Sequence, residues 1–102
     1  MRTVGDIAHK VRSKNAGPFW VTIDIFCGTA EAYAELTASL RTESIAALYR
    51  QPGQLLKRFD IPDLNVIKFS FPRPVVQGHR KDRDMHGAQW SVLLAEYCPD
   101  PA

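Results

Sequence analysis

The hydrophobic pattern of the chain is most regular over residues 19–27, where β-branched and aromatic residues follow one another almost without a break. Strict alternation would give this segment one apolar face, formed by Phe19, Val21, Ile23, Ile25 and Cys27. The opposite face is mixed and carries Trp20, Thr22, Asp24 and Phe26. That combination is typical of a central strand with one face against a hydrophobic core.

Two helices are predicted after this strand. Gly28 breaks the strand, and Thr29 is a residue type that favours the N-cap of a helix. Apolar residues then recur with helical spacing at Tyr33, Leu36 and Leu40. A second, shorter helix is expected to begin at Thr42 and to end before the Pro-Gly pair at positions 52 and 53.

The second half of the chain predicts more strands. Residues 54–61 and 64–71 alternate apolar and polar side chains, and the Pro-Asp pair between them predicts a hairpin. A polar, mixed-charge loop is expected over residues 77–84. After it we expect a short helix over residues 85–91 and a last strand over residues 92–98, although so short an apolar run does not separate helix from strand by periodicity.

From residue 19 onward, the expected order is strand, helix, strand, strand, helix, strand. This is the order of the ferredoxin-like split βαβ arrangement. We therefore expect a single α+β domain over residues 1–102, with a four-stranded antiparallel sheet and helices mainly on one face. Residues 2–8 would form an N-terminal extension, and the helix at Thr42 would be an addition.

Composition narrows the class of protein. The chain has 102 residues, of which 45% are hydrophobic and 24% charged, which excludes collagen, coiled coil and general disorder. The net charge of +2 is too small to predict nucleic-acid binding, and no apolar run approaches the roughly 18 residues that span a bilayer. We expect a soluble cytoplasmic protein with no nucleic-acid or membrane partner. The two cysteines, Cys27 and Cys98, are expected at opposite edges of the sheet and therefore unbonded.

The most suggestive polar segment precedes the central strand. Two cations, a hydroxyl, an amide and a glycine occur within six residues, at Arg12, Ser13, Lys14, Asn15 and Gly17. Backbone N–H groups of such a turn can form an anion-binding nest, to which an arginine adds a bidentate fork. The alternative is an ordinary solvated turn.

A second candidate cluster comprises Asp84, His86 and Gln89, a carboxylate, an imidazole and an amide near a loop. Such a set could perform acid–base chemistry. The alternative is the start of a helix with Asp84 as its cap. The histidines and cysteines have no recurrent metal-ligand spacing, so neither a metal nor a cofactor is expected.

Trp20 and Phe26 lie on the mixed face of the predicted central strand. If helices cover the other face, these rings need a different cover. The added helix at Thr42 or the N-terminal segment could supply it, and so could a second subunit. Both alternatives stay open.

Three segments carry a resemblance to a known family. Residues 11–20, which contain the run Arg-Ser-Lys-Asn-Ala-Gly, together with residues 67–74 and 84–89, resemble domain-of-unknown-function family 4387. More distantly, the chain is similar to the C-terminal domain of the acyclic terpene utilisation protein A (AtuA) family. The resemblance implies a ferredoxin-like domain that elsewhere is fused to a larger catabolic protein, and it implies no established activity.

Three functions follow as hypotheses. The first is an accessory subunit that pairs with a larger AtuA-like protein in the catabolism of a carboxylic acid or acyl-CoA, with an anion-binding loop around Arg12 and Lys14. The second is a small homo-oligomeric isomerase or lyase acting on a small acid, with Asp84 or His86 as base. The third is a structural dimerisation module.

Overall fold

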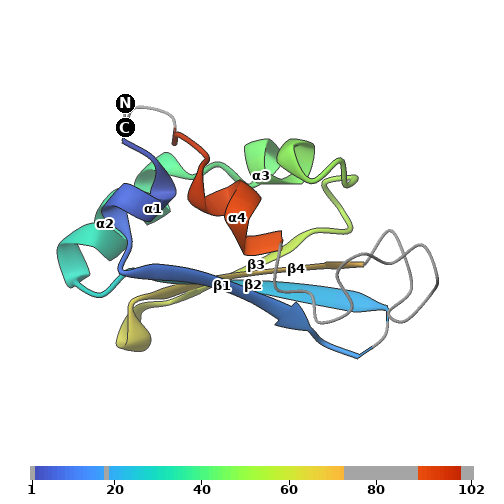
Figure 1. Ribbon diagram of the computed structural model, residues 1–102, viewed down its shortest axis with the longest axis horizontal. Coiled ribbons are helices and arrows are strands. Elements are labelled where there is room, and N and C mark those ends of the chain that lie inside the picture. The colour runs from blue at the N-terminus through green and yellow to red at the C-terminus, as the bar shows by residue number, and fades with distance from the viewer. Residues whose placement is uncertain (1, 18, 73–89, 100–102) are drawn as a thin grey trace.

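A four-stranded antiparallel sheet carries all the described helices on one of its faces (Figure 1). The computed structural model describes residues 2–17, 19–72 and 90–99. Along the chain the helices and strands are α1 (Val4–Ile7), β1 (Lys10–Asn15), β2 (Trp20–Phe26), α2 (Ala30–Ser39), α3 (Thr42–Leu48), β3 (Lys57–Ile61), β4 (Val66–Pro72) and α4 (Trp90–Ala95). A single 3-10 turn, Pro62–Leu64, joins β3 to β4.

The strand order in the sheet is β1-β2-β4-β3, and every neighbouring pair is antiparallel. Strand β2 pairs on both sides, which confirms the prediction of a central strand over residues 19–27. The predicted hairpin is present as β3 and β4. Both predicted helices are also present, and the hydroxyl of Thr29 accepts the backbone N–H of Ala32 at the start of α2, as an N-cap does.

Two predicted elements were wrong. Residues 12–15 of the expected anion-binding loop belong to the edge strand β1, which begins at Lys10 and ends at Asn15. The expected last strand, over residues 92–98, is not there, because residues 90–95 form helix α4. The second error follows from the first, because β1 already occupies the position beside β2 that the last strand would have taken.

The hydrophobic core lies between the sheet and the helices. Val21, Ile23 and Ile25 of β2 point into it together with Phe69 and Phe71 of β4, and all five side chains are fully buried. Each helix contributes at least one fully buried side chain, and these are Val4, Leu36, Ile45 and Leu94. The N-terminal segment and the helix at Thr42 are therefore part of the core layer.

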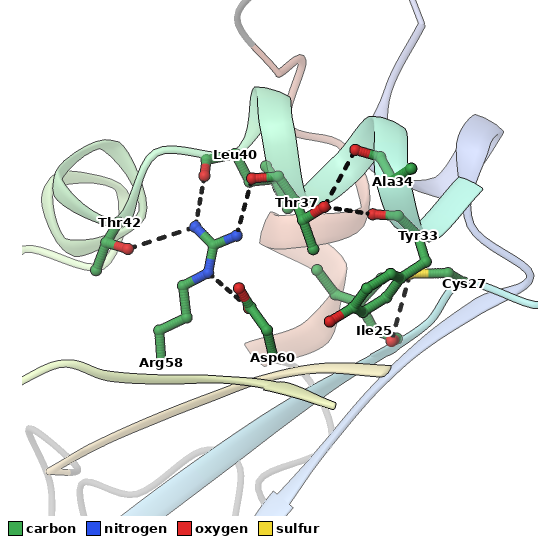
Figure 2. Close-up of polar contacts among 9 residues, drawn as sticks. All are labelled: Ile25, Cys27, Tyr33, Ala34, Thr37, Leu40, Thr42, Arg58 and Asp60. Carbon is green, nitrogen blue, oxygen red and sulfur yellow. Dashed lines mark hydrogen bonds and ion pairs between the residues drawn. The ribbon is translucent and has the colours of Figure 1, made fainter. Parts of the chain in front are cut away.

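Arg58 ties the edge strand β3 to the helix layer (Figure 2). It lies opposite the buried Phe69 in the register, so its side chain points toward the helices. Its guanidinium donates to the backbone carbonyls of Thr37 and Leu40 and to the Thr42 hydroxyl, while Nε donates to Asp60 at 2.9 Å. One side chain thereby connects β3, the end of α2 and the start of α3.

Both cysteines are free thiols. The position predicted for Cys98, at the edge of the sheet opposite Cys27, was wrong, because the expected last strand is replaced by α4. Cys27 is buried at the end of β2, and Cys98 is half-buried after α4. Within residues 2–17, 19–72 and 90–99, no helix is both long enough and apolar enough to cross a membrane.

Candidate functional site: a basic sheet face

The pleat of β1 divides the predicted anion-binding segment between two faces of the sheet. Side chains alternate along a strand, so Lys10, Arg12 and Lys14 point away from the helices while Ser13 and Asn15 point toward them. Arg12 and Lys14 are exposed, whereas Ser13 and Asn15 are half-buried. The residues of β1 that were predicted to surround one anion therefore lie on two opposite faces of the sheet.

The strand register places the exposed side chains of β1 on the same face as side chains of the neighbouring strands. Arg12 is opposite Asp24, which in turn is opposite Lys68. Because directly opposed residues of an antiparallel sheet share a face, the cations of three strands gather on the surface that faces away from the helices. We call this surface the basic face; its cations are Lys10, Arg12, Lys14, Lys57 and Lys68.

The basic face is strongly polarised. It carries five cations and one carboxylate, Asp24, so its charge exceeds the +2 of the entire chain. Lys68 Nζ lies 4.0 Å from Asp24 Oδ1, and the Asp24 side chain is only 18% exposed. Lys10, Arg12, Lys14 and Lys57 are all exposed to solvent. A surface of this kind attracts anionic groups and steers their approach.

Two aromatic rings of this face are covered by lysine side chains. Lys10 Nζ lies 5.1 Å from the centroid of the Phe26 ring, and Lys57 Nζ lies 5.8 Å from that of Trp20. These distances are within the range of cation–π attraction. Phe59, in contrast, is 48% exposed on the edge strand of the same face. All three rings therefore add apolar contact area to the basic face, but a lysine lies over the ring of Trp20 and over that of Phe26.

Two buried oxygens at the centre of the basic face have no hydrogen-bond partner among the described residues. They are Thr22 Oγ1 and Asp24 Oδ1, both on β2. Thr22 is only 8% exposed, and its neighbours across the strands are Lys14 and Ser70. A buried polar group without a hydrogen bond is costly, so Thr22 Oγ1 favours contact with a polar group from outside the described chain, whereas Asp24 Oδ1 has the ammonium group of Lys68 4.0 Å away.

Ser13 and Gly17, two members of the predicted anion-binding loop, each have a structural role in the fold. The Ser13 Oγ accepts a hydrogen bond of 2.9 Å from the backbone N–H of Ser91, in the first turn of α4. Gly17 lies in the connection between β1 and β2 with a φ of +79°, which favours glycine. Only Arg12 and Lys14 of the predicted set reach the basic face.

The structure excludes one of the two covers considered for Trp20 and Phe26, that by the N-terminal segment or the helix at Thr42. Helices α1 and α3 lie on the opposite face of the sheet (Figure 1), and their buried residues belong to the same core cluster as Val21 and Ile25. Of the two covers considered for these rings, a second protein chain is the one still open.

The second candidate cluster, Asp84, His86 and Gln89, lies outside the described residues, as does the polar loop over residues 77–84. Within the part of the chain that the structure describes, no three His, Cys, Asp or Glu side chains are grouped as metal ligands would be.

Three of the five cations of the basic face were not predicted from the sequence, and these are Lys10, Lys57 and Lys68. One signal was available. Cations at positions 10, 12 and 14 have the two-residue period of a strand, and this period places them on one face. Lys57 and Lys68 could not have been added in this way, because only the pairing of β3 with β4 and of β4 with β2 brings them to the same surface.

The chain matches one protein family, whose description assigns no activity. Residues 4–97 match the family described as Domain of unknown function (DUF4387). Neither a curated protein nor a solved structure matches the chain.

Proposed function

Because the chain belongs to the DUF4387 family, to which no activity is assigned, we propose a function from its own geometry: an accessory subunit that binds a larger, acidic partner protein. The basic face is the docking surface. The observation that carries the proposal is the gathering of five cations around one carboxylate on a sheet face that the described helices leave uncovered.

Charge argues for an acidic partner over a second copy of this chain. A two-fold dimer through the basic face would bring identical surfaces together. Each copy would then present five cations and one carboxylate to the same set on the other copy, and like charges at an interface disfavour association. An acidic protein surface reverses the sign of this interaction. It also supplies groups that can pair with Thr22 Oγ1 and with the exposed guanidinium of Arg12.

The lysine contacts argue against single-stranded nucleic acid as the partner. Such ligands are held by bases stacked on free aromatic faces. On the basic face, Lys10 lies over Phe26 and Lys57 lies over Trp20. A base that stacks on Phe26 or Trp20 would have to displace an ammonium group, which leaves Phe59 as the exposed ring of this face, whereas a carboxylate can approach both ammonium groups directly.

We infer a larger AtuA-like protein as the partner from the distant resemblance of the sequence to the C-terminal domain of that family. From the same resemblance we propose a cytoplasmic role in the catabolism of a carboxylic acid or acyl-CoA. The strand order is compatible with a ferredoxin-like arrangement in which the N-terminal β1 replaces the last strand.

The test is co-purification with an AtuA-like protein from the same source. The wild-type chain is compared with Arg12→Glu/Lys14→Glu, which reverses two exposed charges of the basic face. The matched control, Arg2→Glu/Arg41→Glu, reverses two exposed cations that lie elsewhere. We expect the first variant to bind the partner about tenfold or more weakly, and the control to bind it normally. Wild-type binding should also weaken as salt is added.

Three results would overturn the proposal. The first is equal binding of the partner by both double variants. The second is a wild-type dimer, measured by light scattering, that the Arg12→Glu/Lys14→Glu variant no longer forms; this would assign the basic face to a second copy. The third is tight binding of polyuridylate that the same variant loses. Thermal melts of all the proteins show whether each variant is folded.

A further inference from the structure

A pocket lies on the helix side of the molecule, between the end of α3 and the start of α4. It is lined by Leu48, Tyr49, Arg50, Gln51, Trp90 and Leu93. Its wall is mainly apolar, and one exposed arginine stands at its rim. The pocket shares no lining residue with the basic face.

Arg50 occupies a backbone position that normally belongs to glycine. It follows the C-cap of α3 with a φ of +55°. The N–H of Arg50 donates to the carbonyl of Ala47, and the N–H of Gln51 donates to the carbonyl of Ala46 at 2.8 Å. This pair of hydrogen bonds is the Schellman motif, whose left-handed residue is usually glycine because a side chain there is strained. Strain of this kind is often retained where a side chain has a functional role.

The floor of the pocket is formed by aromatic side chains in mutual contact. The Tyr49 hydroxyl donates a 2.7 Å hydrogen bond to the Trp90 carbonyl oxygen. Tyr49 stacks on Phe71 with 4.9 Å between ring centroids, and Trp90 meets the Phe71 ring edge-on at 5.7 Å. The indole N–H of Trp90 is buried, yet it has no hydrogen-bond acceptor within the described chain. The pocket wall therefore includes a side chain with an unused donor.

We propose that this pocket binds a small organic carboxylate with an apolar body. Arg50 pairs with the carboxylate, the indole N–H of Trp90 donates a hydrogen bond to the ligand, and Leu48 and Leu93 contact its apolar part. An apolar concavity with a few fixed polar groups is the common form of a small-molecule site. The guanidinium fork selects a carboxylate over a neutral group.

The chain offers a specific reporter. It has two tryptophans, so Trp20→Phe leaves Trp90 as the sole one. In this background, Trp90 fluorescence is titrated with benzoate, phenylacetate and hexanoate, and with their neutral amides. We expect a saturable change with at least one acid and a much weaker one with its amide. Arg50→Gln should weaken binding of that acid about 10- to 100-fold. Arg41→Gln, at the other end of α3, removes a matched exposed cation and should have no effect.

Arg50→Gly separates a binding role from a structural one. Glycine relieves the backbone strain, so this variant should not melt below the wild type and yet should lose binding. The Arg12→Glu/Lys14→Glu variant should bind the acid normally, which distinguishes this site from the basic face. The proposal is overturned if none of the three acids gives a saturable change, if acid and amide bind equally, or if Arg50→Gln or Arg50→Gly binds as tightly as the parent.

Discussion

The guanidinium of Arg58, on the edge strand β3, donates a hydrogen bond to the backbone carbonyl of Leu40, the C-cap of α2 (Figure 2). The last carbonyls of a helix have no partner within the helix, and cations near them are favourable. The last turn of α2 contains no basic residue of its own. Arg58 supplies the missing charge from a strand and also donates to the carbonyl of Thr37 at 3.2 Å.

Arg58→Ala is therefore expected to destabilise the fold by about 2–3 kcal/mol, because several charge-assisted hydrogen bonds are lost and their carbonyl acceptors are left without a partner. Asp60→Ala removes only the acceptor of the Arg58 Nε hydrogen bond. Because the Asp60 side chain is 42% exposed, this variant should lose about 1 kcal/mol of stability or less. Urea unfolding of both variants measures the difference. Equal losses in the two would show that the contacts of Arg58 with α2 contribute little.

Gly28 and Gly17 both have a positive φ, of +89° and +79° respectively, but their surroundings differ. A Cβ on Gly28 would lie 2.9 Å from the Cβ of His9, whereas a Cβ on Gly17 would meet no heavy atom within 4 Å. Gly17→Ala should therefore cost only the backbone strain, about 1 kcal/mol, while Gly28→Ala should cost about 2–3 kcal/mol. Thermal melts of the two proteins give the comparison; a Gly17→Ala variant as unstable as Gly28→Ala would contradict it.

The elements that the sequence predicted correctly are those with a strong local signal. Strand β2 has an apolar face of its own, and α2 has both a capping residue, Thr29, and apolar residues at helical spacing. Strand β1 has neither, because Val11 is the only apolar residue between Lys10 and Asn15. Its strand conformation depends on pairing with β2, the next strand along the chain, and such pairing can override weak local preference.

Helix α4 was mistaken for a strand for a related reason. Leu94 is fully buried while Val92 and Leu93 are 55% and 45% exposed, so the run of three apolar residues does not mark one buried face. The decision between helix and strand depended on which segment pairs with β2, and this is a tertiary property. The same limit applies to the candidate site: the choice of Arg12 and Lys14 was possible from sequence, whereas their meeting with Lys68 depends on the register.

The Cys27 thiol makes the free energy of unfolding depend on pH in the alkaline range. Burial raises the pKa of its thiol from a usual value of 9.0 to about 11. Below pH 9 the thiol is protonated in both the folded and the unfolded chain, and its full contribution to stability is present. Between pH 9 and 11 the unfolded chain loses this proton first, so the free energy of unfolding falls as the pH rises.

Urea unfolding at about pH 8 and about pH 10.5 should therefore show a smaller loss of stability in Cys27→Ala than in the wild type. Burial also raises the pKa of Tyr49, which adds to the alkaline loss in both proteins and does not affect their difference. The same loss in the two proteins would mean that the Cys27 thiol titrates alike in the folded and unfolded chains.

Ser13→Ala, compared with Arg12→Ala/Lys14→Ala, separates the two faces of β1. The alanine at position 13 removes the acceptor of the Ser91 N–H in the first turn of α4, and losing such a cap costs about 1 kcal/mol. Partner binding should be unchanged, because Ser13 points toward the helices. The double variant should behave in the opposite way: a change in stability of about 0.5 kcal/mol or less, since both side chains are exposed, with clear loss of partner binding. Thermal melts and co-purification with the AtuA-like protein measure the two effects separately. If Ser13→Ala weakens partner binding at unchanged stability, the recognition element is the whole segment around Arg12, as first expected from the sequence, and not the outward face of the sheet.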